Sequence, residues 1–290
     1  MKNIQSKKHP PEPNSPNCRL SHPPPTDSAL DRSPRNQSTA PRLSRYRSPV
    51  PDPLFAHPRL AAVYDAFDGP RHDLPAYLGI ADELDARRVV DIGCGTGCLA
   101  ILLADGGRTV TGVEPAAASL DIARAKDPDR RITWLEGDAT TVPAVAADLA
   151  LMTGNAAQCI LSDDEWMLSL RRIHAALRPG GHLVFETRRP ERRAWEDWAA
   201  DPGPVTVDVA GIGPVRQLRT VTDVRLPFVS FRVEYRFESD GAVLVSDSTI
   251  RFRDRDEIDA SLAANDFRVL DVREAPDRPG REFVFIATRD

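Results

Sequence analysis

The stretch VVDIGCGTG at residues 89–97 decides the fold, because it places an apolar, β-branched run directly before three alternate glycines. The run predicts a buried strand, and CLAILLADGG (98–107) predicts a helix that begins as soon as the glycines end. Glycines let the backbone approach a ligand closely, and α/β sheets bind their ligands at the carboxyl ends of strands. The stretch therefore predicts a ligand site between the first strand and first helix of an α/β domain.

The chain around this loop alternates short β-branched runs with amphipathic stretches, from residue 81 to residue 187. Such alternation is typical of helices packed on both faces of a parallel sheet, so we expect a doubly wound, Rossmann-like α/β fold. The last two apolar runs of the chain would return to the same sheet. The further strands are expected at 108–114, 131–138, 147–153, 181–187, 268–274 and 282–289, and the further helices at 115–127, 162–181 and 255–266.

The pattern changes between residues 203 and 252, where apolar and polar residues alternate as in antiparallel strands. Two such runs, 229–239 and 242–252, meet at the sequence Ser-Asp-Gly-Ala, which is typical of a hairpin turn. The segment 203–252 is therefore expected to be a β-hairpin insertion late in the sheet, and a candidate cap over the active site.

Residues 1–52 differ from the rest in composition. Twelve of the 26 prolines lie before Leu54, and the segment has almost no large apolar residues to offset the entropy of ordering. We therefore expect a disordered, proline-rich, basic tail at 1–52 and one main domain at 53–290. The tail has nine Lys or Arg and four Asp or Glu, so with −5 on the whole chain the rest carries about −10.

An acidic folded domain argues against nucleic acid as a partner, because such proteins gather Lys and Arg on one face. No apolar run approaches the length of a membrane span or forms a secretory signal, so we expect a cytoplasmic protein without membrane contact. The cysteines at positions 18, 94, 98 and 159 are scattered, and no second pair completes a zinc site. No metal is expected.

Charge and spacing around the loop indicate the kind of cofactor. A dinucleotide site prefers G-x-G-x-x-G, and Cys98 occupies the position of its third glycine. Asp91 leads into the loop, where a carboxylate suits an amino acid's ammonium group better than a pyrophosphate. Glu114 ends the second strand 17 residues after Gly97, where an acceptor for ribose hydroxyls is expected. This logic favours S-adenosylmethionine over NAD.

Four motifs in order, over roughly residues 60–187, resemble those of the class I S-adenosylmethionine-dependent methyltransferases. They are VVDIGCGTG, the strand end at Glu114, Gly-Asp-Ala at 137–139 and LRPGGHLVFE at 177–186. The resemblance implies a seven-stranded sheet whose last strand is antiparallel. It also implies cofactor contacts: Asp91, Gly93, Gly95 and Gly97 at the methionine moiety, Glu114 at the ribose, Asp138 and Ala139 at the adenine, and Thr153 and Asn155 along the same pocket. Cys94, within the loop, is a further expected cofactor contact.

The upstream sequence VYDAF (63–67) resembles a helix that folds over the cofactor in many of these enzymes. Tyr64 would then lie near the carboxylate of the cofactor, and the alternative is a packing role. Methyl transfer from a sulfonium needs alignment and exclusion of water, and it needs a base only where the acceptor must lose a proton. The candidate bases are His57, Asp65, His72 and Glu186, for each of which the sequence favours a structural or surface role.

We therefore predict an enzyme that transfers a methyl group from S-adenosylmethionine to a small-molecule acceptor by in-line displacement. The sequence Thr-Gly-Asn-Ala-Ala-Gln after the fourth strand lacks the motif by which related DNA enzymes hold an extruded base. Two alternatives stay open. One is a non-catalytic S-adenosylmethionine-binding regulatory module, and the other is an NAD-dependent oxidoreductase, against which Cys98 argues.

Overall fold

The computed structural model describes residues 51–200 and 203–290. The predicted tail, 1–52, lies outside the described residues except for its last two positions. None of the described helices is long and apolar enough to cross a membrane.

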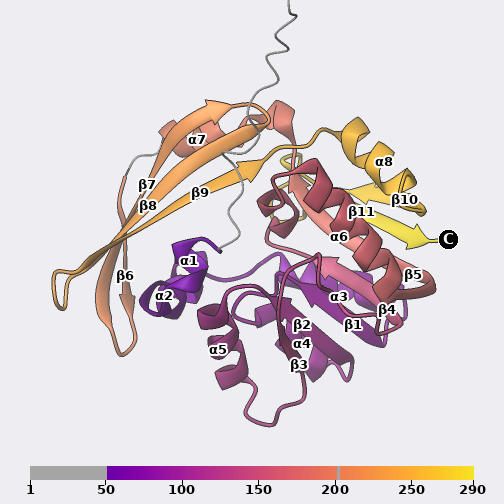
Figure 1. The fold of residues 1–290 in the computed structure, drawn as a ribbon. Coiled ribbons are helices and arrows are strands. Elements are labelled where there is room, and N and C mark those ends of the chain that lie inside the picture. Colours follow the sequence, from indigo (N-terminus) through magenta and orange to yellow (C-terminus); the bar gives the residue numbers. More distant parts are fainter. Residues whose placement is uncertain (1–50, 201–202) are drawn as a thin grey trace, which may run out of the picture. The chain divides into compact units, whose positions relative to one another are not determined.

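The main sheet has seven strands in the order β10-β11-β5-β4-β1-β2-β3 (Figure 1). β11 runs antiparallel to both of its neighbours, β10 and β5, and the strands from β5 to β3 are parallel to one another. The predicted Rossmann-like sheet with an antiparallel last strand is thereby confirmed. The strands are β1 (Arg88–Ile92), β2 (Thr109–Glu114), β3 (Thr133–Glu136), β4 (Ala147–Met152), β5 (Leu177–Arg188), β10 (Phe267–Arg273) and β11 (Glu282–Arg289).

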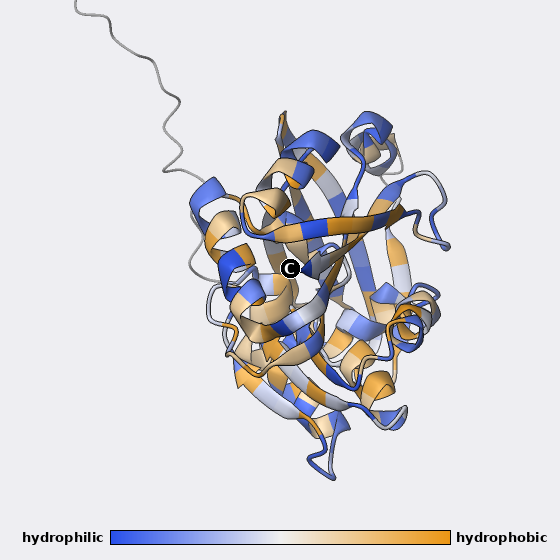
Figure 2. Ribbon diagram, turned by 90° about the vertical axis from the view of Figure 1, so that its right-hand side faces the viewer, coloured by the Kyte–Doolittle hydropathy of each residue, from blue (hydrophilic) through white to orange (hydrophobic). Residues whose placement is uncertain are grey.

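Helices cover both faces of this sheet, so side chains that alternate along β1 are buried in two different cores. Val90 faces a core shared with α6 (Asp163–Ala176) and α8 (Arg255–Ala263). Val89 faces a second core shared with α3 (Leu74–Glu83) and α4 (Cys98–Asp105). Figure 2 shows both hydrophilic and hydrophobic residues in the helices, as expected where one side packs on a sheet and the other meets solvent. The remaining regular elements around this sheet are α5 (Ala117–Lys126), the 3-10 turn η2 (Ala156–Cys159) and the 3-10 turn η3 (Pro190–Arg192).

The end of α6 differs from the prediction of a helix to residue 181. The helix ends at Ala176, and Leu177 is already extended and pairs with Ala147 on β4. Proline disfavours a helical conformation in the residue before it, and Pro179 follows closely. The chain therefore leaves the helix early, and β5 begins at Leu177 instead of residue 181.

The insertion forms a four-stranded antiparallel sheet in the order β6-β7-β8-β9, larger than the predicted hairpin. The sequence identified β8 (Phe228–Phe237) and β9 (Val243–Arg251) but missed β6 (Val205–Val209) and β7 (Gly213–Arg225). Only Val215 of β7 is fully buried, so the strand lacks a clear apolar face.

Three short helices pack against this second sheet and link it to the main domain. Leu60 and Val63 of α2 contact Val215, Tyr235 and Phe237 of the sheet in one apolar cluster. A separate cluster joins the tryptophan at 195 to the apolar residues at 229, 250 and 252. These helices are α1 (Pro53–Ala56), α2 (Pro58–Asp68) and α7 (Ala194–Ala200).

Candidate functional site

The glycine loop lies between β1 and α4, and its backbone demands glycine. Gly93, Gly95 and Gly97 have φ values of 71°, 53° and 83°, in the left-handed region. A Cβ on Gly97 would lie 2.7 Å from the ring of Trp134 and 2.9 Å from Cβ of Ala123. A Cβ on Gly95 would meet no protein atom within 4 Å, so this part of the backbone faces open space. The loop thus presents bare backbone where a ligand can approach.

Replacing Gly97 by alanine is expected to destabilise the protein more than the same change at Gly107. Both glycines have similar positive φ, 83° and 81°, so both variants share a conformational cost of roughly 1–2 kcal/mol. Only position 97 adds a clash, with Trp134 and Ala123, which costs about 1–3 kcal/mol more. Urea unfolding of the two variants measures the difference. Equal losses would mean that Trp134 moves aside freely.

Asp91 is a buried carboxylate with one unsatisfied oxygen. The residue is 1% exposed, and its Oδ2 has no hydrogen-bond partner within 51–200 and 203–290. Burial raises the pKa of Asp91 to about 7, the nearby Arg71 opposes this shift, and Glu114 adds to it. An unpaired buried carboxylate is costly unless a ligand supplies a donor or a cation. The residue therefore fits the ammonium group of an amino acid ligand beside the loop.

Glu114 ends β2 next to Asp91 and is also buried, at 6% exposure. Its Oε2 accepts a hydrogen bond of 3.0 Å from Gly95 N, and its Oε1 accepts one of 2.9 Å from Ala116 N. Burial raises the pKa of Glu114, although these two backbone bonds oppose the shift. The carboxylate thus touches the glycine loop directly, and a ribose would have to share it with Gly95.

Helix α2 is tied to the glycine loop through Asp65. Its carboxylate accepts hydrogen bonds from the Thr96 hydroxyl and from the Lys126 ammonium group, and Lys126 also donates to Thr96 O at 3.1 Å. Tyr64, on the same helix, packs its ring 5.5 Å from that of Phe55, and burial raises its pKa. These contacts hold α2 against the glycine loop, and the role predicted for VYDAF, a cover over the cofactor, stays a prediction.

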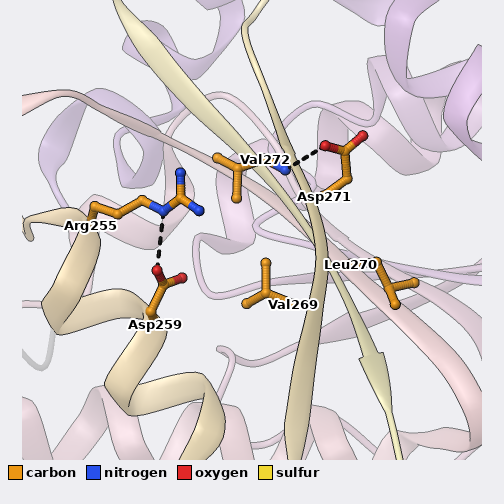
Figure 3. A pocket seen from close by; sticks show the side chains of 6 residues that line it. All are labelled: Arg255, Asp259, Val269, Leu270, Asp271 and Val272. Atoms are coloured by element: carbon orange, nitrogen blue, oxygen red, sulfur yellow. Dashed lines mark hydrogen bonds and ion pairs between the residues drawn. The ribbon is translucent and has the colours of Figure 1, made fainter.

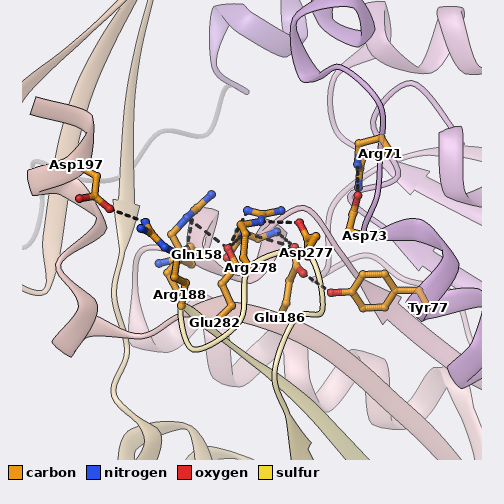
Figure 4. Close-up of polar contacts among 12 residues, drawn as sticks. Arg71, Asp73, Tyr77, Gln158, Glu186, Arg188, Asp197, Asp277, Arg278 and Glu282 are labelled. Atoms are coloured by element: carbon orange, nitrogen blue, oxygen red, sulfur yellow. Dashed lines mark hydrogen bonds and ion pairs between the residues drawn. The ribbon is translucent and has the colours of Figure 1, made fainter. Parts of the chain in front are cut away.

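Glu186 ends up in a buried polar cluster at the carboxyl end of β5 (Figure 4). It accepts hydrogen bonds from the Tyr77 hydroxyl and, at 2.9 Å, from Asn155 N. Glu282, at the start of β11, accepts from Asn155 Nδ2 at 3.2 Å and from Arg278 at 2.9 Å. Burial and the neighbouring Glu282 raise the pKa of Glu186. Glu186 was a candidate from the sequence, whereas Tyr77, Glu282 and Arg278 were not.

The chain matches known proteins over its central part. The model of a methyltransferase domain matches residues 89–181. A cypemycin N-terminal methyltransferase from Streptomyces is 32% identical over 42% of this chain and 50% of its own. A ubiquinone biosynthesis O-methyltransferase from Vibrio parahaemolyticus is 37% identical over 37% of this chain and 46% of its own.

Solved structures match over a larger share. The S-adenosylmethionine-bound structure of CalS10, an amino pentose methyltransferase from Micromonospora echinaspora, is 26% identical, with a TM-score of 0.62 over 79% of this chain and 95% of that one. CcbJ from Streptomyces caelestis has a TM-score of 0.64 over 79% and 95% of the two chains, at 23% identity. Residues 89–181 therefore match a methyltransferase domain, and these similarities support a class I S-adenosylmethionine-dependent methyltransferase fold. The chain spans about half the length of the curated relatives it matches.

S-adenosylmethionine, which is bound in the CalS10 structure, is the cofactor that these similarities support, and the site contains groups that suit it. The unpaired oxygen of Asp91, the open backbone at Gly95 and the buried Glu114 lie together at the carboxyl ends of β1 and β2. Cys94 is buried within the same loop. Thr153 and Asn155 follow β4, and Asn155 is buried in a left-handed conformation with φ 62°.

The remaining site residues predicted from the sequence show fewer features that point to a ligand. Ala139 is buried, whereas Asp138 is exposed and its Oδ1 accepts hydrogen bonds from the backbone and hydroxyl groups of Thr140. His57 caps α2 by accepting from Arg59 N at 3.2 Å, and His72 is exposed. The roles assigned to these residues stay predictions.

A surface hollow of about 530 Å³ lies between α8 and β10, lined by Arg255, Asp259 and the residues 269–272 (Figure 3). Arg255 and Asp259 lie one turn apart on α8 and pair with each other along one wall of the hollow, at 3.1 Å. None of its lining residues belongs to the glycine loop or to the Glu186 cluster. Among the described residues, no group of three or more His, Cys, Asp or Glu side chains is arranged to hold a metal ion.

Proposed function

We propose that this protein transfers the methyl group of S-adenosylmethionine to a small-molecule acceptor. The observation that carries the proposal is the unpaired, buried oxygen of Asp91 beside the open glycine backbone, since it calls for a cationic ligand group at the place where this fold binds its cofactor. The names of two relatives, an amino pentose methyltransferase and a cypemycin N-terminal methyltransferase, support a metabolite or peptide acceptor.

The residues would divide the work as follows. The cofactor supplies an activated methyl group. Asp91 and the loop at 93–97 would hold its amino acid part, Glu114 its ribose, and Asp138 with Ala139 its adenine. Thr153 and Asn155 would line the same pocket.

Helix α2, held by Asp65, would close over the bound cofactor and exclude water, with Tyr64 near the carboxylate. The four-stranded sheet of the insertion would cap the acceptor. These roles amount to alignment and desolvation, which an in-line displacement chiefly requires.

The competing interpretation is a non-catalytic S-adenosylmethionine-binding module, and an NAD-dependent oxidoreductase is a third. We expect the methyltransferase in the cytoplasm, acting on neither nucleic acid nor membrane. The acidic character of the folded part supports this expectation, because it offers little attraction to phosphates.

Thermal unfolding with S-adenosylhomocysteine, the demethylated product, and separately with NAD tests the cofactor. Ligand at about a hundred times its Kd stabilises a protein by roughly 2.7 kcal/mol. For a folded unit of this size that is on the order of 5–10 °C in Tm. A shift with S-adenosylhomocysteine alone is expected. A rise in Tm with NAD alone, or with neither compound, would contradict the proposal.

A further inference from the structure

The Glu186 cluster contains two buried acceptor atoms without a donor. Asn155 Oδ1 and Glu282 Oε2 have no hydrogen-bond partner in the part of the chain that the structure describes. The two residues are 4% and 1% exposed. A buried polar atom without a partner is costly, so native structures rarely leave one unless a ligand or water completes the site.

The orientation of the Asn155 amide is fixed by its neighbours. Its Nδ2 donates to Glu186 at 3.4 Å and to Glu282 at 3.2 Å. The opposite orientation would point the amide oxygen at two carboxylates, which is unfavourable because both partners are acceptors. The carbonyl oxygen of Asn155 is therefore the atom left for a ligand, next to the free oxygen of Glu282.

Strand register places this cluster two strands away from the glycine loop, at the same level of the sheet. Asp91 pairs with Leu151, and Leu151 pairs with Val184, so Gly93 lies level with Thr153 and Glu186. Two strand spacings separate Gly93 from Glu186, or about 10 Å. That is a short span, so a small molecule over β4 and β5 can reach a methyl group held at the glycine loop.

The charged side chains of the cluster sum to a net negative charge that one cation would neutralise. Its acidic side chains are Glu186, Glu282 and Asp277, and its basic side chains are Arg188 and Arg278. Arg188 lies 3.7 Å from Glu282, and Arg278 lies 2.8 Å from Asp277. With every group ionised the sum is one negative charge. A carboxylate or phosphate ligand would add repulsion and would leave both acceptor atoms unpaired. A ligand that brings two N–H donors satisfies both.

We propose that the methyl acceptor is an amine, and that Asn155 Oδ1 and Glu282 Oε2 bind its N–H groups. The inference rests on the proposed function, since it names the substrate class of the same site. A hydroxyl acceptor has a single proton and would leave one of the two oxygens unpaired, whereas a primary amine or its ammonium form has at least two N–H groups.

The reaction balances with this arrangement. One proton of the ammonium group passes to the Glu282 carboxylate, which frees the nitrogen lone pair. The lone pair forms the new N–C bond while the C–S bond of the sulfonium breaks, and its electron pair stays on sulfur. The products are a methylated ammonium ion and a neutral thioether.

The experiment measures transfer of a radiolabelled methyl group from S-adenosylmethionine to a panel of primary amines and to the alcohols of the same carbon skeletons. Uptake by amines alone is expected. Uptake by alcohols alone would contradict the proposal that the acceptor is an amine, and it would still agree with the proposed function. Uptake by neither, with S-adenosylhomocysteine bound, would overturn the amine and favour the binding module. Failure to bind S-adenosylhomocysteine would remove the proposed function itself.

A variant tests the residue assignment. With an accepted amine, Glu282→Gln is expected to lower kcat/KM at least 100-fold while the Kd of S-adenosylhomocysteine changes less than twofold. Glu274→Gln is the matched control, because Glu274 lies on the preceding loop, is exposed and pairs with Arg189 instead. Equal kcat/KM for wild type and Glu282→Gln would overturn the assignment. The amine panel uses the wild type, so the substrate class stays testable if Glu282→Gln does not fold.

Discussion

Replacing Asp91 by asparagine is expected to raise the Kd of S-adenosylhomocysteine by roughly 30- to 150-fold. The carboxylate is buried with one oxygen unpaired, so the ligand's ammonium group can form a charged hydrogen bond to that oxygen, where no described protein donor competes. Hydrogen bonds to charged groups contribute about 2–3 kcal/mol, which gives this range of affinity. Isothermal titration calorimetry at pH 8 measures it.

The same carboxylate gives binding a pH dependence of known sign. Burial raises the pKa of Asp91 to about 7 in the free protein, above the 3.8 of an exposed aspartate. Between these values the folded state binds more protons than the unfolded state, so this group's contribution to stability falls as the pH rises from about 4 to 7. A bound ammonium group favours the ionised form, so binding releases a proton. We expect Kd to fall about tenfold from pH 6 to pH 8 in the wild type, and less in Asp91→Asn.

The control is His182→Ala. His182 pairs with Leu149 in the middle of β5, four residues before Glu186 and away from the carboxyl ends that carry the glycine loop. Its replacement is expected to leave the Kd unchanged at both pH values. If Asp91→Asn binds as tightly as the wild type, the ammonium group lies elsewhere and the cofactor site has been misplaced.

Local patterns predicted the main sheet well and the second sheet poorly. The strand at β1, the glycines and the acidic strand end at Glu114 follow from neighbouring residues, because apolar runs and turns are local signals. β6 and β7 were missed although apolar and polar residues alternate along β6, because only Val209 of β6 and Val215 of β7 are buried and neither strand has a mostly buried face.

The polar cluster was beyond sequence reasoning for a different reason. Glu186 was identified as a candidate at a strand end, but its donor Tyr77 is 109 residues away. Asn155 and Glu282, which contact each other, are 127 residues apart. No periodicity links such positions. The antiparallel return of β11 beside β5 brings them together, because it places the start of one strand at the carboxyl end of the other.

Replacing Phe185 by alanine is expected to destabilise the protein by about 3–5 kcal/mol, which lowers Tm by roughly 6–20 °C. Phe185 is fully buried, and its ring stacks on Phe285 at 5.1 Å and meets the edge of Trp166 at 5.7 Å. The deletion leaves a cavity that these rigid neighbours cannot fill. Leu270→Ala, at a position 46% exposed on β10, is the control and should cost under about 0.5 kcal/mol.

The same packing bears on the site, because Phe185 and Glu186 are adjacent and point to opposite faces of β5. The aromatic stack on one face fixes the strand whose other face holds Glu186 against Tyr77. If the stack holds β5 in place, Phe185→Ala should weaken amine methylation, while S-adenosylhomocysteine, held by β1 and β2, still binds. Differential scanning calorimetry and the methyl-transfer assay below the Tm of the variant measure the two effects. Lost stability with unchanged kcat/KM would show that β5 keeps its position without the stack.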